Sequence, residues 1–108
     1  MVRQDGPLQI VASPNVNGSA PTAATVGTSA STILTANPGR TLVLLTLTTS
    51  SNPTSIAISG QTAVLGSGIA LVNAGDWVLL EGTEATGAIS AIATSASANL
   101  AIQALIQA

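Results

Sequence analysis

The sequence predicts an all-β domain, and three observations lead to this prediction. Short segments rich in Val, Ile, Leu and Thr recur at roughly ten-residue intervals between turns made of Gly, Pro and Asn. Several of these segments alternate apolar and polar residues with the period of two that places one face of a strand on a core. No repeat of fixed length is visible, which argues against a solenoid or a propeller. We therefore expect residues 24–108 to form an antiparallel β-sandwich, either jelly-roll-like or immunoglobulin-like.

The first 23 residues have a different composition and are expected to form an extended N-terminal arm. Prolines recur there among Asn, Gly, Ser and Ala, and proline blocks helix while Gly and Asn favour turns. One apolar patch, residues 8–12, interrupts this polar sequence, and a disordered tail would gain nothing from it. The residues expected to dock this arm are Leu8, Ile10 and Val11.

The strands expected in the sandwich follow one another between turn residues. The strongest spans 41–49, and its early part is apolar on both faces, which suggests a central strand or one covered by a neighbour. The turn at 37–40 is predicted to be type II with Gly39 at a positive φ, and the turn at 73–76 places Gly75 in the same way. The segments expected as strands are 24–28, 31–35, 41–49, 54–59, 69–72, 77–81, 88–94 and 99–106.

The last of these segments is open to two interpretations. Asn99 could cap a helix, because the Ala and Gln that follow are good helix formers. A strand would place Leu100, Ile102, Ala104 and Ile106 on one face, and this period of two favours the strand. Residues 95–98 would then connect it to the preceding strand as a hairpin.

The composition excludes most catalytic chemistry. The 108 residues contain no His and no Cys, and their only bases are two Arg, so a serine lacks its usual general base, and thiol and zinc chemistry are impossible. Asp76, Glu81 and Glu84 are the clustered carboxylates, but no Asp-rich loop accompanies them for calcium, and a glycosidase cleft would need more than one aromatic residue. We expect these acids to close a turn and solvate a loop, and we expect no enzyme activity, no metal and no cofactor.

The low charge also limits the partners. Charged residues are 6% of the chain against an average of about 25%, and the net charge is −2. This excludes the basic footprint that nucleic acids and anionic membranes require. Hydrophobic residues make up 46% of the chain, so a surface this poor in charge is expected to be covered by other protein.

Arg40 and Trp77 each allow two interpretations. Arg40 follows a tight turn, so it is expected to bond nearby carbonyls or one acid; alternatively it anchors a contact between subunits, because Arg is enriched at interface hot spots. Trp77, the sole aromatic residue, is expected to fill the core or plug one end of the sandwich rather than to form a ligand platform.

From Val26 to Ile106 the chain resembles small β-rich structural proteins of tailed-phage virions. The resemblance covers about three quarters of the chain and concerns turn spacing and composition. It rests on Val26-Gly27-Thr28-Ser29, Ile33-Leu34-Thr35-Ala36-Asn37-Pro38-Gly39-Arg40, Ser51-Asn52-Pro53-Thr54, Gly68-Ile69-Ala70-Leu71, Ala74-Gly75-Asp76-Trp77 and Gly87-Ala88-Ile89-Ser90-Ala91-Ile92-Ala93.

The resemblance implies a capsid decoration, or cement, protein. Such a protein would be a homotrimer that binds the major capsid protein on the outside of the head, made in the host cytoplasm because the start of the chain is too polar for a secretory signal. The alternative is a fibre or tail module that binds a host-surface glycan, for which Trp77 is the one aromatic side chain available.

Overall fold

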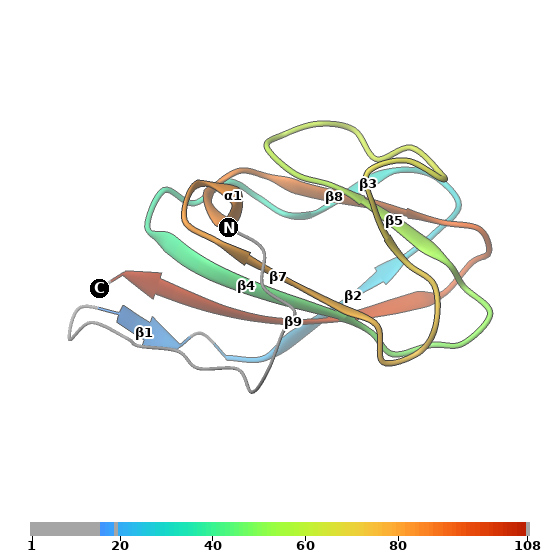
Figure 1. Ribbon diagram of the computed structural model, residues 1–108, viewed down its shortest axis with the longest axis horizontal. Helices are drawn as coiled ribbons and strands as arrows, with labels where there is room; N and C mark the ends of the chain where they lie inside the picture. Colours follow the sequence, from blue (N-terminus) through green and yellow to red (C-terminus); the bar gives the residue numbers. More distant parts are fainter. Residues whose placement is uncertain (1–15, 19, 108) are drawn as a thin grey trace.

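The computed structural model describes residues 16–18 and 20–107, which form two antiparallel β-sheets packed as a sandwich (Figure 1). Sheet A contains β1 (Val16–Gly18), β2 (Thr22–Val26), β4 (Arg40–Leu47), β7 (Trp77–Glu81) and β9 (Ala98–Gln107). Sheet B contains β3 (Ser31–Leu34), β5 (Thr54–Ala57), β6 (Ile69–Leu71) and β8 (Ile89–Ala93). The all-β sandwich expected from the sequence is confirmed.

The strand order is that of a jelly roll. Sheet A runs β1-β9-β4-β7, with β2 also paired to β9, and sheet B runs β3-β8-β5-β6. Counting from β2 to β9, the first, eighth, third and sixth strands form one sheet, and the second, seventh, fourth and fifth form the other. This arrangement of two Greek keys distinguishes the jelly roll from the immunoglobulin-like alternative.

The core lies between the two sheets and is built by alternation along the strands. In β4, Val43, Leu45 and Leu47 are fully buried and belong to this core. Sheet B supplies smaller side chains, such as Ala91 and Ala93 of β8, together with Ile56 and Ile89. Alternating large and small side chains across the two sheets lets them interdigitate at close-packed density.

The C-terminal segment is a strand, as the alternation of its apolar residues predicted. β9 pairs with β4 along most of its length, from Arg40↔Ile106 to Leu47↔Leu100. The hairpin expected at 95–98 is wrong, however, because β8 pairs with β3 and β5 in sheet B while β9 belongs to sheet A. These residues therefore cross from one sheet to the other, as jelly-roll connectivity requires.

One of the two predicted turns differs from expectation. Gly75 has φ 94°, and the Asp76 amide donates to the Asn73 carbonyl, as predicted. The turn at 37–40 closes by the Arg40 amide donating to the Asn37 carbonyl, but Gly39 is not among the positive-φ residues of the described chain, so the turn is not type II. The Asn37 side-chain oxygen accepts the Gly39 amide at 2.9 Å, and this local bond stabilises a different turn.

The loop expected between Gly82 and Gly87 contains one helical turn, α1 (Thr83–Thr86). Ala85 is fully buried in the core, so α1 closes one end of the sandwich beside β4 and β7 (Figure 1). No helix among the described residues is long and apolar enough to cross a bilayer.

Candidate interaction surfaces

The N-terminal docking residues Leu8, Ile10 and Val11 lie outside the described residues. The part of the expected arm that is described is extended and belongs to sheet A. β1 pairs with the end of β9 through Val16↔Gln107, and β2 begins at Thr22, opposite Ile102. β1 and β2 together pair with the edge of β9 that faces away from β4.

Arg40 is buried, with 4% of its surface exposed. Its Nε donates to the Ala85 carbonyl at 2.6 Å, one terminal nitrogen donates to the Thr35 carbonyl at 3.1 Å, and the other donates to the Gly87 carbonyl at 2.9 Å. Burial lowers the pKa of the Arg40 guanidinium below its ordinary value, because desolvation disfavours the charged form. Arg40 therefore bonds nearby carbonyls, as one of its two interpretations expected. A contact between Arg40 and a second subunit stays a prediction, and the burial of Arg40 does not favour it.

The three clustered carboxylates do not converge on one point. Asp76 Oδ2 accepts the Val72 and Asn73 amides at 2.9 and 2.8 Å, and these two bonds hold the pKa of the Asp76 carboxyl below its ordinary value of 3.8. Glu81 ends β7 and Glu84 lies in α1. Among the described residues, no group of acidic side chains is placed to hold a metal ion.

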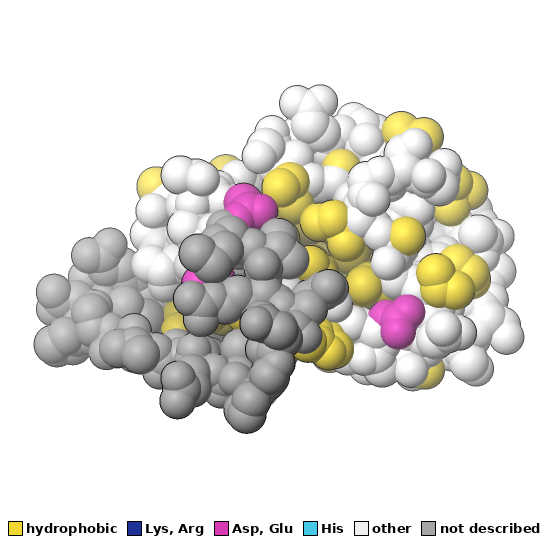
Figure 2. All heavy atoms as spheres, viewed as in Figure 1, with side chains coloured by type: hydrophobic (Ala, Val, Ile, Leu, Met, Phe, Trp, Pro, Cys, Tyr) yellow, Lys and Arg dark blue, Asp and Glu magenta, His cyan; other side chains and the backbone are white. Residues whose placement is uncertain are grey.

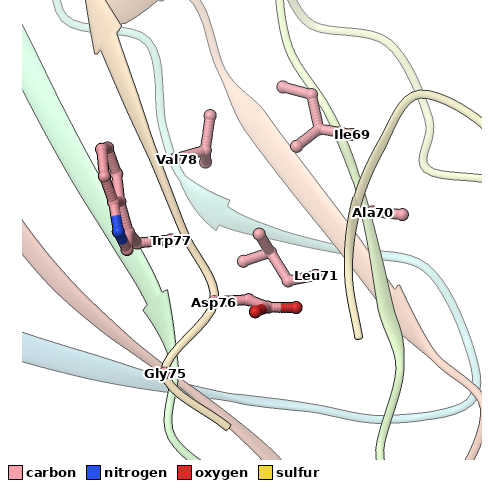
Figure 3. A pocket seen from close by; sticks show the side chains of 7 residues that line it. All are labelled: Ile69, Ala70, Leu71, Gly75, Asp76, Trp77 and Val78. Carbon is pink, nitrogen blue, oxygen red and sulfur yellow. The ribbon is translucent and has the colours of Figure 1, made fainter. Parts of the chain in front are cut away.

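A groove of about 370 Å³ opens between β6 and β7, the edge strands of the two sheets (Figure 3). Ile69, Leu71 and Val78 give it an apolar wall, and Asp76 lies at one end. Trp77 also borders it, but its side chain lies on the far side of β7 from Leu71 (Figure 3). Trp77 is half-buried opposite Thr46 and lies outside the core between the sheets, so the expected core position is wrong.

The loop at 58–68 folds over sheet B and presents apolar side chains to solvent. The Ser90 hydroxyl donates to the Gln61 carbonyl and accepts the Ala63 amide, both at 2.8 Å, and the Ser55 hydroxyl accepts the Gly66 amide at 3.0 Å. Between these ties, Val64 is 58% exposed and Leu65 is 44% exposed. In the sequence Val64 and Leu65 lie between Gly60 and Gly66, and the fold places both side chains in solvent.

The few charged residues of the described chain lie outside sheet B, at the start of β4 and on or beside β7. Sheet B and the 58–68 loop contain no charged residue, and the exposed Val72 directly follows β6. The face drawn in Figure 2 shows hydrophobic side chains gathered in a band with acidic side chains at its margins. We call the exposed residues Val64, Leu65 and Val72 the apolar rim.

Comparison with known proteins gives one informative match. Neither the search of family models nor the search of curated proteins finds a match. Among solved structures, the fold is similar to a chain from Bacillus endospore appendages, which are described as a family of disulfide-linked pili. The TM-score is 0.51 at 13% identity, over 93% of this chain and 98% of that one. At this identity the likeness establishes a shared sandwich fold and no more.

Proposed function

We propose that this protein is a virion structural protein of a tailed phage, a decoration protein that binds the outside of the major capsid lattice and stabilises the head. The observation that carries the proposal is the exposure of the apolar side chains Val64 and Leu65 on a loop that carries no charge and covers an uncharged sheet. Jelly rolls are recurrent in viral capsid proteins, which agrees with the resemblance found in the sequence.

Attachment would work by burial of neutral surface over the joints between capsomers. The apolar rim supplies side chains that gain free energy when water is removed from them, at roughly 25 cal/mol per Å² of apolar surface. An interface of about 1,600 Å² suffices for stable association, and a trimer that binds through three such surfaces gains further by avidity. Because Val64, Leu65 and Val72 are uncharged, burying these side chains does not require any ion pair to lose its water.

A second candidate is a subunit of a protein filament, and the likeness to an endospore pilus chain favours it. The protein of that structure is described as disulfide-linked, whereas the present chain has no Cys. A filament of this chain would therefore be held together by non-covalent contacts alone. Both candidates are structural proteins that function in an assembly.

Cryo-electron microscopy with antibody labelling, on particles and cells that carry the gene, tests the proposal and separates the two candidates. Label on phage heads supports the decoration protein, and label along extended fibres supports the filament. A protein found dispersed as single chains, with label on neither structure, contradicts both.

A pair of variants tests whether the apolar rim binds the capsid. Val64→Asp places a charge in the apolar rim and is expected to reduce head occupancy, because the buried carboxylate would have no partner. Thr22→Asp places the same charge on the exposed strand β2 of the other sheet and serves as the matched control. Equal occupancy for the two variants would remove the apolar rim from the mechanism.

A further inference from the structure

The strands at the edges of the two sheets differ in how open they are to another chain. β1 and β6 are only three residues long, β3 has an irregular register with β8, and β7 begins after Asp76 and ends in Glu81. Shortness, irregularity and charge are features that protect edge strands from pairing with a second chain. β2, which lies along β9 (Figure 1), has none of them, because its five residues carry no charge and no Pro and its register with β9 is regular.

The backbone groups of Ala23 and Thr25 point away from sheet A. The Asn99 carbonyl of β9 accepts the amide of the residue that directly follows β4, at 3.0 Å, so Asn99 directs its backbone groups to the β4 side. Successive residues of an antiparallel strand bond to opposite sides, so Leu100 bonds toward β2, where it pairs with Ala24. Ala23 and Thr25 therefore direct their amides and carbonyls to the open edge of sheet A, where no described strand pairs with β2.

We propose that β2 is the interface with a second copy of this chain. The two β2 strands pair antiparallel across a two-fold axis and join two copies of sheet A into one continuous sheet. With the axis between the two Ala24 residues, Ala23 of each copy lies opposite Thr25 of the other, and each of these pairs exchanges both backbone bonds, so four hydrogen bonds form. Ala24 meets Ala24 of the copy as a non-hydrogen-bonded pair, whose Cα atoms approach to about 4.5 Å, and its small side chain suits this distance.

The residues that flank β2 select this register over the alternatives. A shift that places Ala23 opposite Ala23 of the copy brings Thr25 opposite Pro21, which has no amide to donate. A shift that places Thr25 opposite Thr25 of the copy brings Ala23 opposite Gly27, whose carbonyl already accepts an amide of β8 at 2.8 Å. The register centred on Ala24 uses all the open backbone groups of both strands.

The neutral sequence of β2 suits a second copy in particular. A two-fold axis brings identical strands together, so a charge near the axis would face a like charge of the other copy. β2 carries no charge, and all of its side chains except Val26 are exposed or half-buried. An isologous contact is also complete after two copies, so it does not propagate into an aggregate.

The pairing leaves the apolar rim free and goes beyond the proposed function. The loop that presents Val64 and Leu65 is tied to sheet B, so both copies of the pair can still bind a capsid, and a two-fold contact joins one proposed trimer to the next. Thr22 lies opposite Val26 of the copy, outside the four bonds, and its own copy is roughly 14 Å away along the strands. A charge at Thr22 is therefore not expected to break the pair.

Disulfide cross-linking of the full chain tests the register, because the natural sequence has no Cys. Ala24→Cys places two thiols across the axis at a Cα separation that a disulfide can bridge, so oxidation with copper phenanthroline should convert most of the protein to a covalent dimer. Thr22→Cys is the matched control, since Thr22 is more exposed than Ala24 on the same strand but too far from its copy, and it should stay monomeric on a non-reducing gel. Equal cross-linking of the two variants, or none in Ala24→Cys, overturns the pairing.

Amide hydrogen exchange measured by NMR tests the bonds themselves in the unmodified protein. In the pair, the Ala23 amide should exchange at least about tenfold more slowly than in Thr25→Pro, which lacks the amide that faces the copy but keeps the bonds of β2 to β9. Thr25→Ala is the control and should leave Ala23 protected. Fast exchange at Ala23 and Thr25 of the wild type, as at an open edge, overturns the proposal. Both experiments use isolated protein, so their outcome is independent of whether the protein decorates a capsid.

Discussion

At the scale of single residues, the most constrained group in the described chain is the Arg40 guanidinium. It joins three chain segments, because its acceptors are the carbonyls of Thr35, Ala85 and Gly87, which lie before β4 and around α1. Ala85 lies in the single turn of α1 and Gly87 directly follows it, and carbonyls at such an end lack partners within the turn, so the guanidinium satisfies two of them. Arg40 thereby fixes α1 over the end of the core.

Substitution of Arg40 is expected to be among the most destabilising changes in the chain. Arg40→Met leaves three carbonyls without their charged donor and should lower the free energy of unfolding by on the order of 3 kcal/mol. Arg40→Lys keeps the charge but loses the planar fork, so we expect about half that loss. Urea denaturation of the two variants measures both values. If Arg40→Lys unfolds with the same free energy as the wild type, the positive charge alone is enough for stability and the planar guanidinium is not required.

Asp76 is expected to make stability depend on pH in the acid range. Its folded pKa is depressed below 3.8 because the ionised carboxylate accepts the Val72 and Asn73 amides. The ionised Asp76 carboxylate therefore stabilises the fold fully at pH values above its ordinary pKa. This stabilisation is lost as the pH falls through the pKa of Asp76 in the folded protein. Asp76→Asn should remove this dependence below about pH 4, as measured by urea denaturation at several pH values. An identical acid profile in wild type and Asp76→Asn would contradict the assignment.

For Arg40 the sequence predicted the kind of hydrogen bond that the side chain makes, but it did not predict which residues accept those bonds. Arg40 was expected to bond carbonyls, but two of its acceptors lie 45 and 47 residues away in sequence, and no local pattern identifies them. The type II turn failed for a local reason, since the Asn37 side chain bonds the Gly39 amide and stabilises another turn. Trp77 and Leu79 lie outside the core between the sheets, and this could not be predicted before the strand register was known.

At the scale of elements, β5 and β6 illustrate how closely strands and loops are fitted together. Gly68, with φ 76°, directly precedes β6, and a Cβ there would lie 2.7 Å from the Ile56 carbonyl oxygen. Ile56 pairs with Ile69, so a side chain at residue 68 would push against the strand pairing itself. The glycine is required by the close approach of two backbones as well as by its φ.

A matched pair of glycine substitutions separates these two effects. Gly66 has φ 78° with no atom within 4 Å of a built Cβ, so Gly66→Ala should cost only the left-handed backbone strain of about 1–2 kcal/mol. Gly68→Ala adds a backbone clash and should cost clearly more. Thermal unfolding of both variants tests this, and equal losses would show that the β5–β6 pairing relaxes freely around residue 68.

The elements were predictable where their signal was local. β7 has the bounds expected from its apolar run between Asp76 and Gly82, and β9 followed from its period of two. β2 begins at Thr22, two residues before the expected 24, because its pairing with β9 starts there. Which strand pairs with which was not predictable, since six of the seven pairings join strands that are not consecutive in the chain.

At the scale of the whole molecule, the distribution of charge divides the fold into two sides. Asp76, Glu81 and Glu84 lie on or beside β7 of sheet A, with Asp76 next to Val72, while the described residues of sheet B and its covering loop are neutral and present Val64 and Leu65. Contacts between copies through the acidic side would oppose like charges, whereas contacts through sheet B would not. A neutral side can therefore meet either a copy or a partner without a matching set of ions.

This division leads to a prediction about salt. Raising the NaCl concentration from about 0.1 to about 1 M shortens the Debye length from ~10 to ~3 Å, which weakens any attachment that depends on exposed ion pairs. Attachment through the apolar rim should survive this change, and sulfate, which strengthens the burial of apolar surface, should increase it. Sedimentation of particles after each wash, followed by quantification of bound protein, measures the effect. A decoration protein held by charged residues would be released by NaCl, and that release would place the interface on the acidic side of sheet A instead.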